Sequence, residues 1–129
     1  MPPSRESELL AADRFARSFA IELIPAAPDR VCVAMTLERE HVDAAGRVRS
    51  GVAFTIADCA MSLISNATTR AFAVTAHLVV GGSASPGQTM TATAAAALRG
   101  PGRVTWHVDV TVDRDHIATF TGTTLEVPA

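Results

Sequence analysis

One carboxylate lies within an otherwise apolar stretch and is the first residue to consider for chemistry. Residues 51–67, GVAFTIADCAMSLISNA, contain Asp58 as their only charged residue. A carboxylate in apolar surroundings is a stronger base than one in water, because burial raises its pKa, and such a base can activate a water molecule. The same carboxylate can instead be a structural group that is hydrogen-bonded to Thr55, Ser62 or the backbone. The residue pattern alone leaves both interpretations open.

The element that must position Asp58 is predicted to be a helix over residues 51–67. At ~1.5 Å per residue it is about 25 Å long. Nearly all of its side chains are apolar or small, which predicts burial on nearly all sides. Its polar residues Thr55, Asp58, Ser62 and Asn66 recur at steps of three and four, so they share one face of the helix.

The rest of the chain has the alternating pattern of β-strands. A short amphipathic helix is predicted first, over residues 5–17, with Ser4 or Ser7 as its N-cap. The alanine-rich run 89–98 has helical propensity, but its alternating threonines and flanking strands favour a strand. One buried helix with a strand-rich remainder predicts a single α+β domain over residues 1–129, in which one antiparallel sheet wraps around the helix. The predicted strands cover residues 19–24, 31–38, 72–80, 89–98, 104–112 and 116–127.

The composition excludes several classes of partner. The chain is 48% hydrophobic and 19% charged, with a net charge of −2. It has no basic stripe, so we expect no nucleic-acid partner, and no apolar run long enough to span a membrane. Its N-terminus lacks the apolar core of a secretory signal, and Cys32 and Cys59 lack C-x-x-C spacing, which predicts free thiols in a cytoplasmic protein. The four scattered histidines form no ligand cluster, so we expect no metal.

Residues 41–67, HVDAAGRVRSGVAFTIADCAMSLISNA, resemble the hotdog-fold acyl-CoA thioesterases, in particular their phenylacetate-degradation (PaaI-like) branch. That branch has an Asn followed by His-Gly-Gly, and then Leu-Ala-Asp in a helix that ends near another Asn. The matching residues here are Asp43, Arg49-Ser50-Gly51, Ile56-Ala57-Asp58 and Asn66. The resemblance continues through AVTAHLVVGGSASPGQTMTATA and the last two strands.

The resemblance implies a hotdog fold, two chains paired edge to edge as a dimer or a dimer of dimers, and an active site at the dimer interface. It implies that Asp58 is the general base or nucleophile at a thioester carbonyl, that the Gly51 N–H polarises this carbonyl, and that Thr75 of the partner chain positions water. The implied activity is hydrolysis of an acyl-CoA, with aromatic acyl groups included; coenzyme A is part of the substrate and no separate cofactor is expected. Substrate contacts are expected from Ser50, Phe54, Ser62, His77, Gly82 and Ser83.

Two departures from the family pattern affect the expected site. Asp43 replaces a neutral Asn and Arg49 replaces a His. An arginine beside a helix N-terminus costs about 0.3–1 kcal/mol, so our hypothesis is that Asp43 and Arg49 form an ion pair across the loop. A pair between Arg49 and Asp58 would instead lower the pKa of the base and weaken it, and Arg49 could also point to solvent. We therefore include Asp43 and Arg49 among the candidate catalytic residues. The alternatives to an enzyme are an acyl-CoA or acyl-group binding protein that lost activity through these two residues, and a purely structural subunit.

The remaining candidates have simpler interpretations. His41 is predicted to be a loop histidine, and His107 and His116 to be exposed strand residues. Trp106 is predicted to be an anchor of the core or of an interface. One hydratase branch of the fold carries a His five residues after its helix Asp, where this chain has Leu63, so hydration is not expected.

Overall fold

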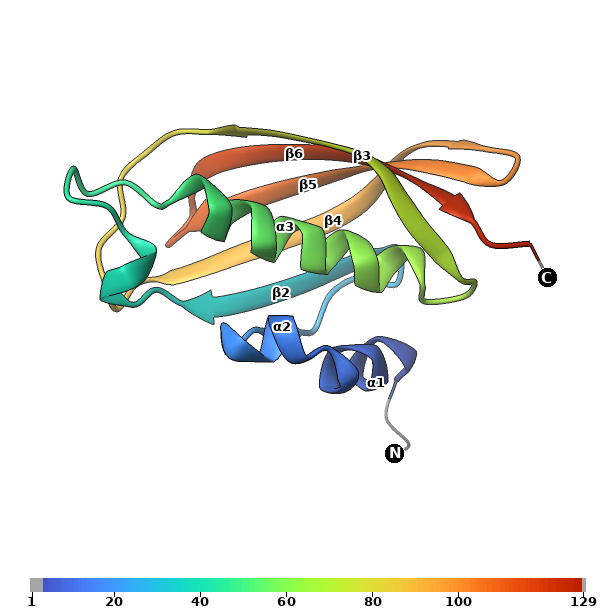
Figure 1. Cartoon of the computed structure of the whole chain (residues 1–129), viewed down its shortest axis with the longest axis horizontal. Coiled ribbons are helices and arrows are strands. Elements are labelled where there is room, and N and C mark those ends of the chain that lie inside the picture. Colours follow the sequence, from blue (N-terminus) through green and yellow to red (C-terminus); the bar gives the residue numbers. More distant parts are fainter. Residues whose placement is uncertain (1–3, 129) are drawn as a thin grey trace.

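The computed structural model describes residues 4–128. The chain forms three α-helices, one 3-10 turn and six strands within these residues (Figure 1). In chain order the elements are α1 (Arg5–Ala12), α2 (Arg14–Ser18), β1 (Glu22–Ile24), β2 (Arg30–Thr36), η1 (Arg39–His41), α3 (Ser50–Ser65), β3 (Ala71–Val80), β4 (Thr89–Gly100), β5 (Arg103–Val112) and β6 (Asp115–Glu126).

All six strands belong to one antiparallel sheet with the order β1-β2-β4-β5-β6-β3. The long helix α3 lies against one face of this sheet, and α1 and α2 lie beside it near β2 (Figure 1). This is the predicted α+β arrangement of a sheet around one central helix. No helix among the described residues is long and apolar enough to cross a membrane.

The sheet-facing side of α3 forms the centre of the core. Ala53, Ile56, Ala57 and Ala60 are fully buried there. The opposite side is partly open to solvent, so the expectation of burial on nearly all sides is too strong. At its end, the Asn66 side chain donates to the Ser62 carbonyl at 3.0 Å and accepts the Ala71 N–H at 2.9 Å. Asn66 therefore ties the helix end to the start of β3.

Small residues allow α3 to approach the sheet closely. A Cβ at Gly122 on β6 would lie 2.5 Å from the Met61 sulfur, so any larger residue here would force the Met61 side chain to move. Ala92 and Ala94 on β4 are fully buried beneath the helix, which leaves no open slot along this strand. Trp106 on β5 is buried, and its indole N–H donates to Thr124 Oγ1 at 2.9 Å, so the tryptophan is a core anchor.

The predicted N-terminal helix is divided at Asp13. This residue ends α1 and then caps α2, with its carboxylate accepting the Ala16 N–H at 3.0 Å. Of the two predicted N-caps, Ser4 and Ser7, it is Ser4 that caps α1. The predicted strand over 19–24 is shorter, because Ala20 has a positive φ of 54° and turns the chain before β1 begins. The alanine-rich run is a strand, as predicted, and extends over Thr89–Gly100.

Strand β3 is the edge of the sheet and presents apolar side chains to solvent. Its outer edge pairs with no other strand of the described chain. Phe72, Val74 and Val79 on this strand are 52%, 47% and 62% exposed. A long, apolar, unpaired edge strand is a template for pairing with another chain.

Candidate functional site

The N-terminus of α3 borders a cavity of about 580 Å³. The cavity brings together five of the predicted site residues, which come from two loops and the first turn of the helix. They are Asp43, Arg49, Ser50, Gly51 and Gly82. As the second residue of the helix, Gly51 has an N–H with no acceptor within α3, and the helix dipole makes this end attractive to negative charge. This end of the site can therefore polarise a carbonyl oxygen.

Asp43 closes the loop that precedes the helix. One carboxylate oxygen accepts the N–H groups of Ala45 at 2.9 Å and Arg47 at 3.0 Å. The hydrogen bond from Arg47 lowers the pKa of Asp43 most, and the charges of Arg47 and Arg49 lower it further. Asp43 is thus a stable anion that shapes the loop.

The hypothesised ion pair between Asp43 and Arg49 is not formed. Among residues 4–128, Arg49 has no carboxylate within 4.0 Å, and its side chain is exposed. Asp43 Oδ1 instead accepts two backbone amides of its own loop, and the Arg49 side chain extends into solvent. Arg49 therefore leaves a free cation at the mouth of the cavity.

Asp58 lies two turns further along α3 and is half-buried on the side that faces away from the sheet. Thr55 donates its hydroxyl to the Gly51 carbonyl at 2.8 Å instead of to Asp58. Within the described chain no hydrogen bond or ion pair engages the Asp58 carboxylate. Burial raises the pKa of Asp58, and the negative charge of Asp13 raises it further. The alternative that Asp58 is a structural residue held by hydrogen bonds is therefore wrong for the described chain.

The other predicted residues lie in three places. Phe54 and Ser62 share the helix face of Asp58, and the Phe54 ring packs edge-on against Phe120 with centroids 5.5 Å apart. Thr75 and His77 lie on β3, on the face turned away from α3, because their partners on β6 alternate with the buried Phe120. The Thr75 hydroxyl accepts the Thr123 N–H at 3.0 Å beside an irregularity in the ladder. The backbone of Ser83 forms an isolated antiparallel β-bridge with that of Arg47, next to the cavity.

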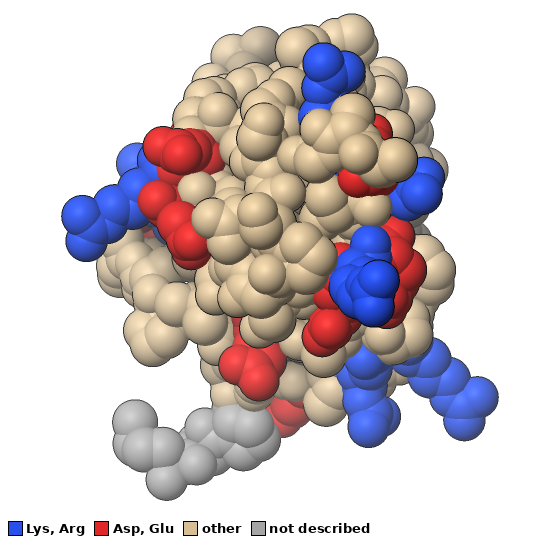
Figure 2. All heavy atoms as spheres, turned by 90° about the vertical axis from the view of Figure 1, so that its left-hand side faces the viewer, with Lys and Arg blue, Asp and Glu red and all other residues tan. Residues whose placement is uncertain are grey.

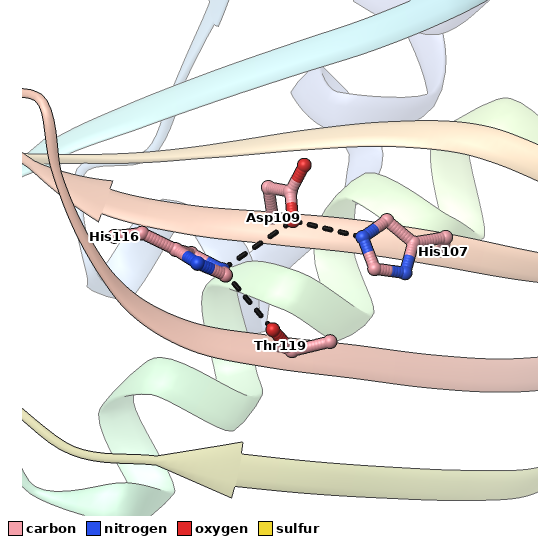
Figure 3. Close-up of polar contacts among 4 residues, drawn as sticks. All are labelled: His107, Asp109, His116 and Thr119. Atoms are coloured by element: carbon pink, nitrogen blue, oxygen red, sulfur yellow. Dashed lines mark hydrogen bonds and ion pairs between the residues drawn. The ribbon is translucent and has the colours of Figure 1, made fainter.

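A separate polar cluster lies on the outer face of the sheet (Figure 3). Asp109 Oδ1 is 2.8 Å from His107 Nε2 and 3.3 Å from His116 Nε2, and His116 Nε2 is 3.1 Å from Thr119 Oγ1. A hydroxyl–imidazole–carboxylate relay needs opposite ring nitrogens, and here one nitrogen makes both contacts of His116. The cluster therefore does not activate Thr119 as a nucleophile. Among the described residues, no three His, Cys, Asp or Glu side chains are arranged to hold a metal ion.

Three further residues correct or complete the sequence predictions. His41 is in η1 and only 8% exposed, so it is a buried residue and not a loop histidine. Burial raises the pKa of the Cys59 thiol to about 12, which keeps this neighbour of Asp58 protonated and unreactive. Sequence reasoning missed Asp13, although an aspartate three residues before Ala16 in a helical pattern is a typical N-cap signal.

Figure 2 views the end of the molecule at which α3 begins. Basic and acidic side chains are interspersed across the described part of this face, with no large area of one sign. The charge that a ligand meets is therefore set by the few side chains that line each cavity. For the cavity at the start of α3 these include Arg47 and Arg49.

No family model and no curated protein sequence matches the chain, but many solved structures do. The PaaI protein of the phenylacetic acid degradation operon of E. coli superposes with a TM-score of 0.89 at 20% identity, over 97% of this chain and 92% of that one. A mutant of the phenylacetic acid degradation protein PaaI from Thermus thermophilus gives 0.82 at 25% identity, over 89% and 100%. A hypothetical thioesterase with coenzyme A from Streptococcus pneumoniae gives 0.74 at 15% identity, over 83% and 85%.

These likenesses identify the architecture. The chain has the hotdog fold, in which an antiparallel sheet packs around one long helix. Its structural neighbours are PaaI-like proteins and named thioesterases, as the sequence resemblance predicts. At these identities the likeness extends to the fold, so the chemistry has to be argued from the residues of this chain.

Proposed function

We propose that this protein hydrolyses an acyl-CoA thioester, with Asp58 as the general base, in a site shared by two copies of the chain. The observation that carries the proposal is the Asp58 carboxylate, which is half-buried, has a raised pKa and has no partner among the described residues. A charge in this position is unfavourable for the fold alone, and groups of this kind concentrate at functional sites.

The reaction needs two groups on opposite sides of the thioester carbonyl. Asp58 takes a proton from a water molecule, and the water oxygen attacks the carbonyl carbon. The Gly51 N–H and the positive end of the helix dipole stabilise the oxyanion that develops. The tetrahedral intermediate then expels the sulfur of coenzyme A, which receives the proton held by Asp58. The products are a free acid and coenzyme A.

The spacing along α3 supports a shared site. Gly51 and Asp58 lie on the same helix face but seven residues apart, which is about 10 Å along the axis. Asp58 does not line the cavity at Gly51 of the same chain, so within one chain the two groups do not face a common space. Two helices that run side by side in opposite directions would bring Gly51 of one copy close to Asp58 of the other.

The free edge of β3 supports such a dimer. Two-fold pairing along this edge would cover the exposed Phe72, Val74 and Val79 and continue the sheet across two copies. It would also set the two α3 helices antiparallel. Arg47 and Arg49 at the cavity mouth are suited to the phosphate groups of coenzyme A.

The neighbours agree with this class of substrate. Several of them are named thioesterases, and one is a structure with coenzyme A. From the PaaI-like resemblance we propose that aromatic acyl groups are among the substrates.

A thiol-release assay over aliphatic and aromatic CoA esters tests the proposal. Asp58→Asn should lower kcat by about 10²- to 10⁴-fold, which is the usual contribution of a general base. The control is Asp29→Asn, the same chemical change at an exposed residue outside the cavity at Gly51, which should leave kcat nearly unchanged. Full activity of Asp58→Asn would refute the assignment of the base. A ligand-induced rise in melting temperature with no release of thiol would support the non-catalytic binding protein instead.

A further inference from the structure

A second cavity, of about 540 Å³, lies beside the opposite edge of the sheet. It exists because β1 pairs only with Cys32–Ala34 of β2, which leaves Met35 and Thr36 without a neighbouring strand on that side. The turn at Ala20, with its positive φ of 54°, carries the chain from α2 past this gap. The cavity is therefore a consequence of the backbone path.

The charged residues that line this cavity are all acidic. Glu22, Glu38 and Glu40 come from β1, the β2–η1 loop and η1, and no arginine lines the cavity with them. A cleft lined by one sign of charge raises the local concentration of counter-ions. The cavity at the start of α3 contains Arg47 and Arg49 instead. Because coenzyme A carries negatively charged phosphates, the acidic cavity is unsuited to it.

His41 supplies a directed hydrogen-bond donor to the same cavity. His41 is only 8% exposed. Its Nδ1 accepts the Glu38 N–H at 2.9 Å, and its ring packs against that of Phe19 with centroids 5.7 Å apart. Since Nδ1 accepts a hydrogen bond, the proton of the neutral imidazole is on Nε2. Nε2 has no hydrogen-bond partner among the described residues. Every fully buried side-chain nitrogen or oxygen of these residues does have a partner, so Nε2 is not fully buried. Nε2 is therefore accessible, and His41 is one of the residues that line this cavity.

We propose that this cavity binds a small organic cation. Its ammonium or guanidinium group would lie among the three glutamates, and a carbonyl or hydroxyl next to the charge would accept the His41 Nε2–H. An apolar body on the ligand would pack against Phe19 and Ile24, which also line the cavity. The ligand is distinct from an acyl-CoA, so the proposal stands or falls independently of thioester hydrolysis.

Calorimetric titration of the full chain at pH 7 tests the proposal with three matched probes. L-Leucinamide has an ammonium group, an adjacent carbonyl and an apolar body, and it should bind saturably. N-Acetyl-L-leucinamide lacks the charge and should not bind. Isoamylamine keeps the ammonium group and a similar apolar body but lacks the carbonyl, and it should bind several-fold more weakly.

Neutral variants locate the site. Glu22→Gln and Glu40→Gln should each weaken leucinamide binding about tenfold, because each removes one charge-assisted contact. Both residues are exposed, so the variants should keep the wild-type melting temperature. Glu8→Gln on α1, outside the cavity, is the matched control and should bind like wild type. Absence of leucinamide binding, equal binding of any two of the three probes, or an equal loss in Glu8→Gln would overturn the proposal.

Discussion

If Gly51 and Asp58 act on one carbonyl from two copies of the chain, lesions in the two residues must complement each other in a mixed dimer. A dimer of one Asp58→Asn chain and one Gly51→Val chain would have one site with both lesions and one site with neither. Valine at position 51 meets no atom within 4 Å of its Cβ, so the fold accommodates it while the side chain crowds the amide. The mixed dimer should therefore show about half the wild-type activity per dimer, because one of its two sites is intact.

Two different affinity tags allow the mixed dimer to be isolated after co-expression, and thiol release then measures its activity. Each homodimer of a single variant should be strongly impaired and should still be dimeric by light scattering. Activity should recover in the mixed dimer because Gly51 and Asp58 of one chain lie about 10 Å apart along the helix. If the mixed dimer is as inactive as the two homodimers, both groups act within one chain and the shared site is wrong.

Three further predictions concern the helix and its neighbours. Gly122→Ala should destabilise the protein by about 1–3 kcal/mol, because the added Cβ would lie 2.5 Å from the sulfur of Met61, which is 1% exposed. Asp58→Asn should raise the melting temperature at pH 7. Burial raises the pKa of Asp58 in the folded state, so ionisation of this carboxyl destabilises the fold as the pH rises through that pKa. The gain in melting temperature should therefore vanish below pH 3.8, where the carboxyl is protonated in both states. Asp13→Asn should keep the cap on Ala16 but remove a negative charge, which should lower the pKa of Asp58 and shift the acidic limb of the rate profile to lower pH.

Simple controls separate these effects from general damage. Gly81→Ala adds a Cβ with no atom within 4 Å and should leave stability nearly unchanged in the same melts. Wild-type stability of Gly122→Ala would refute the close approach of α3 to β6. Carbon-13 NMR titration of the Asp58 carboxyl in wild type and Asp13→Asn measures the pKa directly, without reference to activity. An unchanged pKa in Asp13→Asn would exclude Asp13 as an electrostatic partner of Asp58.

Much of the fold was predictable because its signals are local. The alternation in 31–38 and 104–112 reports which side of each strand is buried, and the polar stripe through Asp58 reports the open side of α3. The break at Asp13 and the short β1 were missed, because one capping side chain and one positive φ at Ala20 override the local pattern. These are single-residue effects that periodicity does not detect.

The candidate site was predictable only in part. The sequence identified Asp58 as a charged residue in an apolar helix, and the resemblance placed Gly51 at the helix start. It suggested an ion pair between Asp43 and Arg49, but the acid instead accepts two amides of its own loop. The competition between a side-chain partner and backbone amides depends on the loop conformation, which the residue types do not determine.

The sequence by itself determined the identity of the elements and the presence of one carboxylate in an apolar helix, since hydrophobic periodicity and composition are properties of neighbouring residues. Only the tertiary structure decided that Asp58 has no partner among the described residues, that β3 is a free edge of their sheet, and that Glu22, Glu38 and Glu40 line one cavity with the buried His41. These features depend on strand order and on the path of the chain between elements. They arise from contacts between residues far apart in the sequence, whose pairing is decided by how the whole sheet closes around α3.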